Sequence, residues 1–164
     1  MFGRYEPPVL LESQDLTLSL EAKDDRHLYR RTGIAGEKEI QVISPAPALV
    51  VNPIEPLTLP QEGIAHFLEV AFPSIVLAPA GSYHTFLTMP VEIGVFIGKN
   101  SVFTLIDRLS LSPVKYSLYG DPESGVITRL HRSLLSSTIP PVDPLSEGVL
   151  SLTLTNLSTD YTTL

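Results

Sequence analysis

The stretch Lys115–Arg132 reads K-Y-S-L-Y-G-D-P-E-S-G-V-I-T-R-L-H-R and predicts two strands joined by a tight turn. In the turn, Pro122 fixes its own φ, Asp121 can accept a local backbone hydrogen bond, and glycines on either side tolerate positive φ. On the returning strand successive side chains alternate between faces, so Arg129 and His131 share one face. The stretch therefore predicts a β-hairpin that presents a cation and a titratable imidazole on the same side.

Prolines divide the rest of the chain in the same way. There are 15 of them in 164 residues, and they separate short runs rich in Val, Ile, Leu, Thr, Phe and Tyr. Three of these runs alternate with a period of two: L-T-L-S-L (Leu16–Leu20), V-E-I-G-V-F-I (Val91–Ile97) and V-L-S-L-T-L (Val149–Leu154). The pattern predicts an all-β fold, an antiparallel β-sandwich or jelly roll with proline-rich loops and at most one short helix.

One segment fits two secondary structures. Ile64, Phe67 and Leu68 begin a helical spacing, whereas Leu68, Val70 and Phe72 alternate as in a strand. The residues alone leave both alternatives open for 65–72.

Composition restricts the class of protein. A chain of 164 residues favours one domain, expected to span residues 1–164 as a single β-sandwich. A hydrophobic fraction of 43% with 18% charged residues argues against disorder. The net charge of −7 disfavours nucleic-acid and anionic-membrane partners, and the absence of cysteine excludes thiol catalysis, disulfides and thiolate metal sites.

The chain shows no targeting or spanning signal. No basic-then-apolar leader opens it, and charged residues interrupt its longest apolar runs. We therefore expect no membrane insertion and a cytoplasmic location.

Four phrases are specific in combination: Val51–Pro60, Pro90–Ile97, Lys115–Arg129 and Asp143–Leu152. Together, in this order and over nearly the whole chain, they resemble an archaeal family of uncharacterised proteins, domain-of-unknown-function family 432. The resemblance implies an archaeal source, favours a strand over Phe67–Phe72 and implies no activity. It also implies one or two further strands beyond Leu164, without which a sheet edge would be open for pairing with a second copy.

Polar residues of the hairpin form the best candidate ligand-binding set. The set comprises Lys115, Tyr116, Tyr119, Asp121, Arg129 and His131, with Glu92 from the preceding apolar strand. Arginine and lysine beside tyrosines can hold a carboxylate, a phosphate or a sugar. The alternative, which we favour, is that Arg129 pairs with Asp121, Glu123 or Glu92 and pins the hairpin.

Two other polar features are expected at the surface. Glu92 alternates with Val91, Ile93 and Val95, which predicts a solvent-facing side chain on a half-buried strand. If Glu92 faced the core instead, it would be a candidate acid or base, or the partner of a buried arginine. A local basic patch is predicted to be a solvated strand face; it comprises Lys23, Arg26, Arg30 and Arg31.

Three functions remain open from the sequence. The leading hypothesis is a non-enzymatic binding or assembly module that associates with a second copy through a sheet edge or face. The alternative is a binder or enzyme of a small anionic ligand that uses the 115–132 hairpin. The third is a cupin-like metal enzyme, disfavoured because its histidines are far apart in sequence (His27, His66, His84 and His131). No catalytic motif is present, so no catalytic residue, metal or cofactor is assigned.

Overall fold

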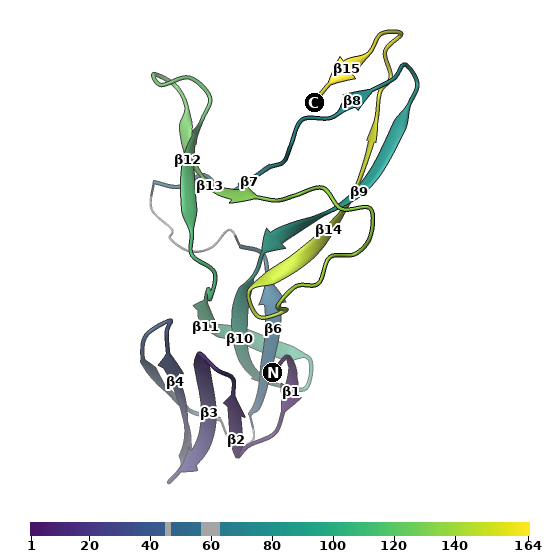
Figure 1. Ribbon diagram of the computed structural model, residues 1–164. Coiled ribbons are helices and arrows are strands. Elements are labelled where there is room, and N and C mark those ends of the chain that lie inside the picture. The colour runs from purple at the N-terminus through teal and green to yellow at the C-terminus, as the bar shows by residue number, and fades with distance from the viewer. Residues whose placement is uncertain (45–46, 57–62) are drawn as a thin grey trace. The chain divides into compact units, whose positions relative to one another are not determined.

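The computed structural model describes residues 1–44, 47–56 and 63–164 (Figure 1). Over these residues the chain forms fifteen β-strands and no helix. The strands pair almost entirely antiparallel, in several sheets. The predicted all-β, sandwich-like fold class is confirmed. The proline-containing phrase Val51–Pro60 begins as the end of a strand, and its part from residue 57 lies outside the described residues.

The described residues group into two compact units, and each is described by itself. Unit 1 comprises Met1–Glu55 and Glu92–Leu111, and unit 2 comprises Pro56–Val91 and Ser112–Leu164. Unit 1 is thus built from two separate stretches of chain. That residues 1–164 form a single domain stays a prediction.

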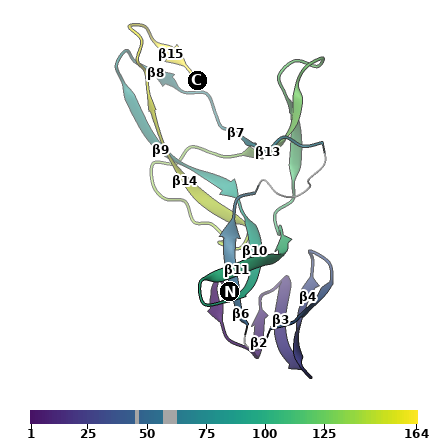
Figure 2. The same ribbon diagram turned by 180° about the vertical axis from the view of Figure 1, so that it is seen from behind.

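Unit 1 consists of two four-stranded antiparallel sheets, visible as separate layers in Figure 1 and, from behind, in Figure 2. The first sheet has the order β2 (Val9–Glu12), β3 (Leu16–Lys23), β4 (Arg26–Gly33) and β5 (Lys38–Val42). The second has the order β1 (Gly3–Tyr5), β6 (Ala48–Ile54), β10 (Glu92–Lys99) and β11 (Val102–Leu109).

The apolar core of the described residues lies in unit 1. Leu16, Leu18 and Leu20 of β3 are each 1% exposed or less, as the period of two predicts. Strand β10 lies between β6 and β11, and Ile93 and Val95 are fully buried there. Of sixteen buried apolar residues, only Leu77 and Leu87 belong to unit 2.

Close backbone approach at the end of β4 requires a glycine. Gly33 has a φ of +139°, and a Cβ at this position would lie 2.2 Å from the carbonyl oxygen of Asp15. The same approach lets the Ile34 N–H donate to the Asp15 carbonyl oxygen at 3.0 Å. A side chain at residue 33 would push the two backbones apart.

Unit 2 contains three small sheets. Their orders are β12 (Lys115–Tyr119), β13 (Val126–Arg132) and β7 (Leu68–Ala71); β14 (Glu147–Thr155) and β9 (Ser82–Pro90); and β15 (Thr162–Thr163) and β8 (Val76–Leu77). Within the ambiguous segment 65–72, Leu68–Ala71 forms the strand β7, which pairs parallel to β13. Pairing with β13 therefore selects the strand over the helix, a choice that local periodicity left open.

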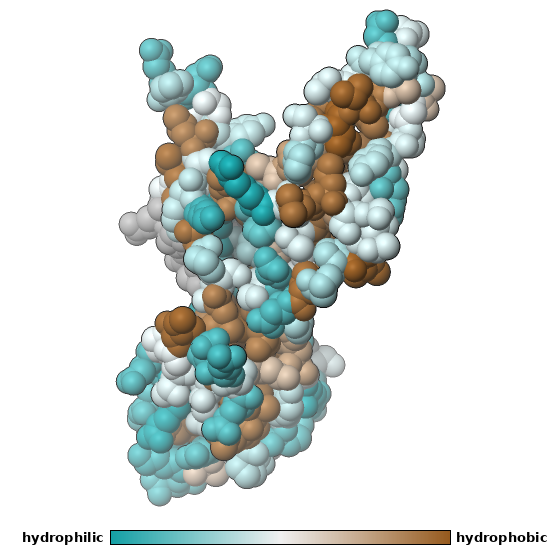
Figure 3. Space-filling model, viewed as in Figure 1, coloured by the Kyte–Doolittle hydropathy of each residue, from teal (hydrophilic) through white to brown (hydrophobic). Residues whose placement is uncertain are grey.

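Unit 2 buries polar groups but few apolar ones. Asn156 is 5% exposed, and its side-chain amide donates to three backbone carbonyls, those of Leu77, Ala78 and Asp160, at 3.1, 3.1 and 2.7 Å. By contrast, large apolar side chains are exposed over much of this unit. Of twenty such residues in the described chain, only Leu10, Ile34, Ile43, Val102 and Leu105 lie in unit 1. Figure 3 shows this apolar surface along the β12–β13 hairpin and the β9–β14 ribbon.

Candidate functional site

The hairpin predicted over 115–132 is confirmed, and its register decides which side chains share a face. Tyr116 lies directly opposite Arg129 and therefore shares its face, whereas Lys115 lies opposite Leu130 and Tyr119 opposite Val126, on the other face. The predicted set is thus divided between the two sides of the sheet.

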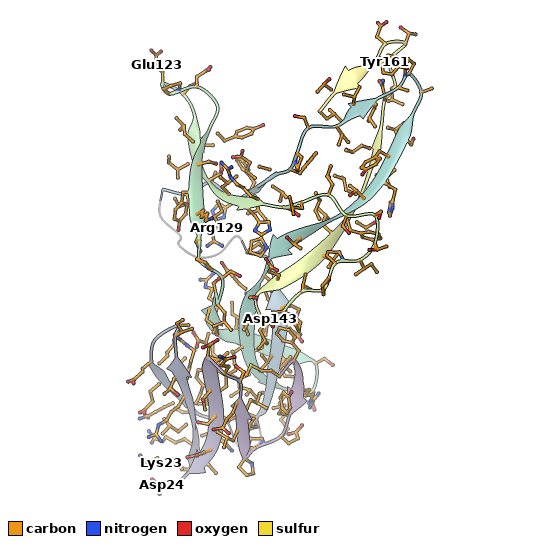
Figure 4. All side chains as sticks on the ribbon, in the orientation of Figure 1. Lys23, Asp24, Glu123, Arg129, Asp143 and Tyr161 are labelled. Atoms are coloured by element: carbon orange, nitrogen blue, oxygen red, sulfur yellow. The ribbon has the colours of Figure 1, made fainter. Side chains whose placement is uncertain are left out.

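The acidic residues of the hairpin, Asp121 and Glu123, lie in its turn, away from Arg129. The Asp121 carbonyl accepts hydrogen bonds from the backbone N–H groups of Ser124 (3.2 Å) and Gly125 (2.6 Å), which closes the turn. Figure 4 shows Glu123 at the tip of the hairpin and Arg129 toward its base. The turn carboxylates therefore lie before the start of β13, whereas Arg129 lies in the middle of that strand.

Arg129 is a buried cation. It is 4% exposed, and its guanidinium donates through Nη1 to the Pro56 carbonyl oxygen. The side chain therefore ties β13 to the chain that precedes β7, and little of its charge is presented to solvent. Binding of a small anion by the hairpin residues stays a prediction.

Glu92 is fully buried, so its predicted exposure is wrong. It begins β10 and lies opposite Ile54 of β6. Alternation predicts exposure only when one face of a strand is solvated, and the first four residues of the central strand β10, Glu92–Val95, are all buried. The buried alternative considered for Glu92 is therefore the correct placement.

His131 joins β13 to β9. Its Nε2 lies 3.0 Å from Thr88 Oγ1, and the Thr88 backbone N–H donates to Ser133 Oγ at 2.8 Å. Burial lowers the pKa of His131 below its ordinary 6.5; Glu147 opposes this shift and Lys115 adds to it. The imidazole is therefore held in its neutral form at neutral pH.

The other face of the hairpin carries a hydroxyl network and an aromatic pair. Ser117 Oγ donates to the Glu69 carboxylate and lies 3.1 Å from Thr128 Oγ1. Phe67 and Tyr119 stack edge to face, with ring centroids 5.3 Å apart. These contacts connect the three strands β12, β13 and β7 on that face.

The strongest charge cluster of the described residues was missed by sequence analysis. It centres on Asp107 of β11, whose side chain is 1% exposed. Asp107 Oδ2 accepts hydrogen bonds from Tyr29 Oη at 2.8 Å and Arg31 Nε at 2.7 Å. Asp107 Oδ1 accepts one from Lys38 Nζ at 2.9 Å. The donors belong to β4 and β5, so the cluster bonds the two sheets of unit 1 together.

The Asp107 cluster is electrostatically satisfied. Burial alone would raise the pKa of Asp107, but the hydrogen bonds from Lys38, Arg31 and Tyr29 outweigh it and lower that pKa. Burial and the neighbouring carboxylate raise the pKa of Tyr29 far above its ordinary 10. Every charge has a partner, so the cluster is a structural link and offers no free group to a ligand.

The sequence predicts Arg31 on a solvated basic face, and that prediction is wrong. The residue is 8% exposed, and its Nη1 also donates to the carbonyl oxygens of Ala35 and Gly36. The one available sequence signal was Asp107, an acidic residue inside the apolar run Val102–Leu111. Such a residue needs a buried partner, but periodicity does not identify which one.

Two surface depressions in unit 1 present no cluster of free charged groups. One, of about 360 Å³, is lined in part by Arg30, Arg31 and Lys38. Arg30 pairs there with Glu39 at 2.9 Å, and the other two cations bind Asp107. The second, of about 290 Å³, surrounds the exposed β3–β4 turn. Among residues 1–44, 47–56 and 63–164 no His, Cys, Asp and Glu side chains group as metal ligands.

Exposed apolar side chains cluster on and beside the β12–β13 hairpin. We call them the hairpin patch, and they are between 38% and 57% exposed: Phe67, Val114, Tyr116, Leu118, Tyr119, Val126 and Ile127. They occupy both faces of the sheet, because Leu118 lies opposite Ile127 and Tyr119 lies opposite Val126. Clustered exposed apolar side chains are a common mark of an interaction site.

These features define a class: an all-β, sandwich-like protein with a well-buried first unit and an apolar surface on its second. The described residues contain no helix long and apolar enough to cross a membrane. The model of the family described as "Protein of unknown function (DUF432)" matches residues 1–164, so the chain belongs to that family. This confirms the family resemblance, whereas the archaeal source stays a prediction. No curated protein and no solved structure matches the chain.

Proposed function

We propose that the protein is a non-enzymatic assembly module that associates with further copies of itself through the hairpin patch of unit 2. One observation carries the proposal: the two units differ sharply in where their apolar side chains lie. Unit 1 holds all but two of the sixteen buried apolar residues, whereas unit 2 holds all but five of the twenty exposed large ones. Apolar surface of this kind is typical of an interaction site.

The size of the hairpin patch suits reversible association. Complete burial of a large apolar side chain stabilises by about 1.5–3 kcal/mol, so half-exposed side chains gain roughly half of that. Because the seven residues lie on both faces of the sheet, they give at most about 5–10 kcal/mol before costs, which is similar to the entropy lost when two molecules associate. We therefore expect an equilibrium that depends on concentration.

Charge works against this assembly and provides a second signature. Two copies of a chain with a net charge of −7 repel each other in dilute buffer. Salt screens that repulsion and does not weaken apolar contacts. Association should therefore strengthen as sodium chloride is raised, which is the opposite of what an ion-paired interface would show.

The experiment is sedimentation velocity over a wide concentration range, with matched variants. Leu118→Lys and Ile127→Lys place charges in the hairpin patch at residues that are 45% and 41% exposed. Ile43→Lys is the control, because it changes an 85% exposed apolar residue in unit 1. The unchanged protein and the control should associate, and the two patch variants should sediment as monomers. A wild-type protein that stays monomeric at high concentration and high salt would overturn the proposal.

A further inference from the structure

Among the residues that the structure describes, the outer edge of β12 is open. Strand order places β12 at one end of the β12-β13-β7 sheet, and no backbone group among the described residues pairs with its outer side. The strand has five residues, Lys115–Tyr119, without proline and with one charge at its first position. Natural edge strands are usually protected by several charges, a proline or a bulge. This edge has little of that protection.

Strand β14 also lies at a sheet edge, and the number of exposed apolar side chains distinguishes β12 from β14. The β12–β13 pair carries five exposed large apolar side chains, those of Tyr116, Leu118, Tyr119, Val126 and Ile127. The β14–β9 pair carries two, Leu150 and Tyr83, each 37% exposed. The surface that remains to be covered is therefore concentrated beside the β12 edge.

We propose that β12 of one molecule pairs antiparallel with β12 of a second copy about a two-fold axis at Ser117. This inference rests on the proposed self-assembly and specifies its interface. An antiparallel two-fold contact of this kind is self-complementary, because each copy contributes the same strand. Two three-stranded sheets join into one of six strands, in the order β7-β13-β12-β12-β13-β7, and neither β12 edge is left open.

The sequence of β12 fits itself in this register. Lys115 lies opposite Tyr119 of the second copy, and Tyr116 lies opposite Leu118 of the second copy. The first pair places an ammonium beside an aromatic ring, and the second joins two apolar side chains. No like charges face each other. Lys115 also approaches the turn that follows Tyr119 in the second copy, which carries Asp121 and Glu123.

Other registers use the strand less well. Moving the axis by one residue, to Tyr116 or Leu118, leaves two of the five residues of each strand without a partner. With Ser117 on the axis all five are paired, and the apolar face made by Tyr116 and Leu118 continues across both copies. The full overlap therefore selects this register.

Single-cysteine variants test the register directly, because the chain has no cysteine of its own. Directly opposed residues in antiparallel strands have Cα atoms about 4.5–5.5 Å apart, which a disulfide can bridge. Ser117→Cys should therefore form a covalent dimer under mild oxidation. Ser124→Cys, in the exposed turn, reports the background from random collisions. The readout is non-reducing gel electrophoresis of the full chain.

A mixed pair of variants tests the same register without altering Ser117 and its hydrogen bonds. Lys115→Cys or Tyr119→Cys alone should not cross-link, because equivalent residues lie about 13 Å apart along the two strands. Mixed together, the two variants should cross-link, since residue 115 of one copy faces residue 119 of the other. The expected result is a covalent dimer in the mixture that is several-fold more abundant than in either variant alone.

Failure of the inference differs from failure of the proposed function. A monomeric wild-type protein in sedimentation would remove both. An associating wild-type protein in which Ser117→Cys and the mixture cross-link no more than Ser124→Cys would overturn the β12 interface only. Preferential cross-linking of Ser151→Cys, at the middle of β14, would then assign the assembly to the other edge.

Discussion

The Arg31 guanidinium lies 2.7 Å from the Asp107 carboxylate, Nε to Oδ2, and this ion pair connects the two sheets of unit 1. The pair is almost fully removed from water, with side chains 10% and 1% exposed. Tyr29 donates to the same oxygen of Asp107. A buried carboxylate is tolerated here because three donors meet it, and their own charges and dipoles depend on it in return.

Removing the carboxylate should therefore destabilise the protein more than a typical substitution does. We expect Asp107→Ala to lower the free energy of unfolding by about 3–5 kcal/mol, because Arg31 is left buried without its partner. Urea unfolding followed by circular dichroism measures this change. The control is Asp121→Ala in the exposed turn, expected to change stability by less than about 0.5 kcal/mol. Equal effects at the two positions would contradict the structural role of the cluster.

The lowered pKa of Asp107 predicts a stability that falls in acid. A carboxyl group whose pKa is lower in the folded than in the unfolded state stabilises fully above its ordinary value of 3.8. That contribution is lost as the pH falls below 3.8 toward the lowered value. Unfolding free energies measured between pH 7 and pH 2 should drop through this window. In Asp107→Asn the drop in unfolding free energy should be smaller. The same pH dependence in this variant and in the unchanged protein would argue against a lowered pKa of Asp107.

His131 predicts a second pH effect, in unit 2 and in a higher window. Its pKa is lowered by burial, so the unfolded state binds a proton more readily, and the stability that it contributes is lost as the pH falls below 6.5. An NMR titration of the imidazole should give a pKa below 6.5. Because Lys115 lowers this pKa and Glu147 raises it, Lys115→Gln should move it up and Glu147→Gln should move it down. Shifts of the opposite sign would show that these charges do not act on His131.

Gly33 and Gly36 form a matched pair for testing backbone contact. Both have positive φ, but an added Cβ meets the Asp15 backbone at residue 33 and nothing within 4 Å at residue 36. Gly36→Ala should cost about 1 kcal/mol from φ alone, and Gly33→Ala should cost clearly more. Thermal unfolding of the two variants makes the comparison. Similar losses would mean that the Gly33 backbone can move away from Asp15 freely.

The period of two was enough to predict the strands, because alternation depends only on local geometry. Leu16, Leu18 and Leu20 are buried as predicted, and the 115–132 hairpin forms with its turn at Asp121–Gly125. The 65–72 segment needed more, since its strand form depends on parallel pairing with β13, some sixty residues later in the chain.

Periodicity could not predict which faces become covered on both sides. Glu92 and Arg31 were placed in solvent because alternation marks two faces of a strand without saying what packs on each. Asp107 and its donors Tyr29 and Arg31 are 78 and 76 residues apart in sequence, and no local pattern connects them. For the candidate ligand set, sequence predicted the alternation on β13, but the burial of Arg129 against Pro56 depends on a long-range contact.

The interrupted chain of unit 1 has a consequence during synthesis. Strands β2 to β5 emerge from the ribosome early, but β10 and β11 of the facing sheet follow only after Val91. Until they appear, Arg31 lacks its partner Asp107. The apolar side of β3 also lacks the strands that cover it and remains exposed to neighbouring nascent chains. We therefore expect nascent chains to be most prone to associate with one another while the intervening segment is translated, and less so once Leu109 is in place.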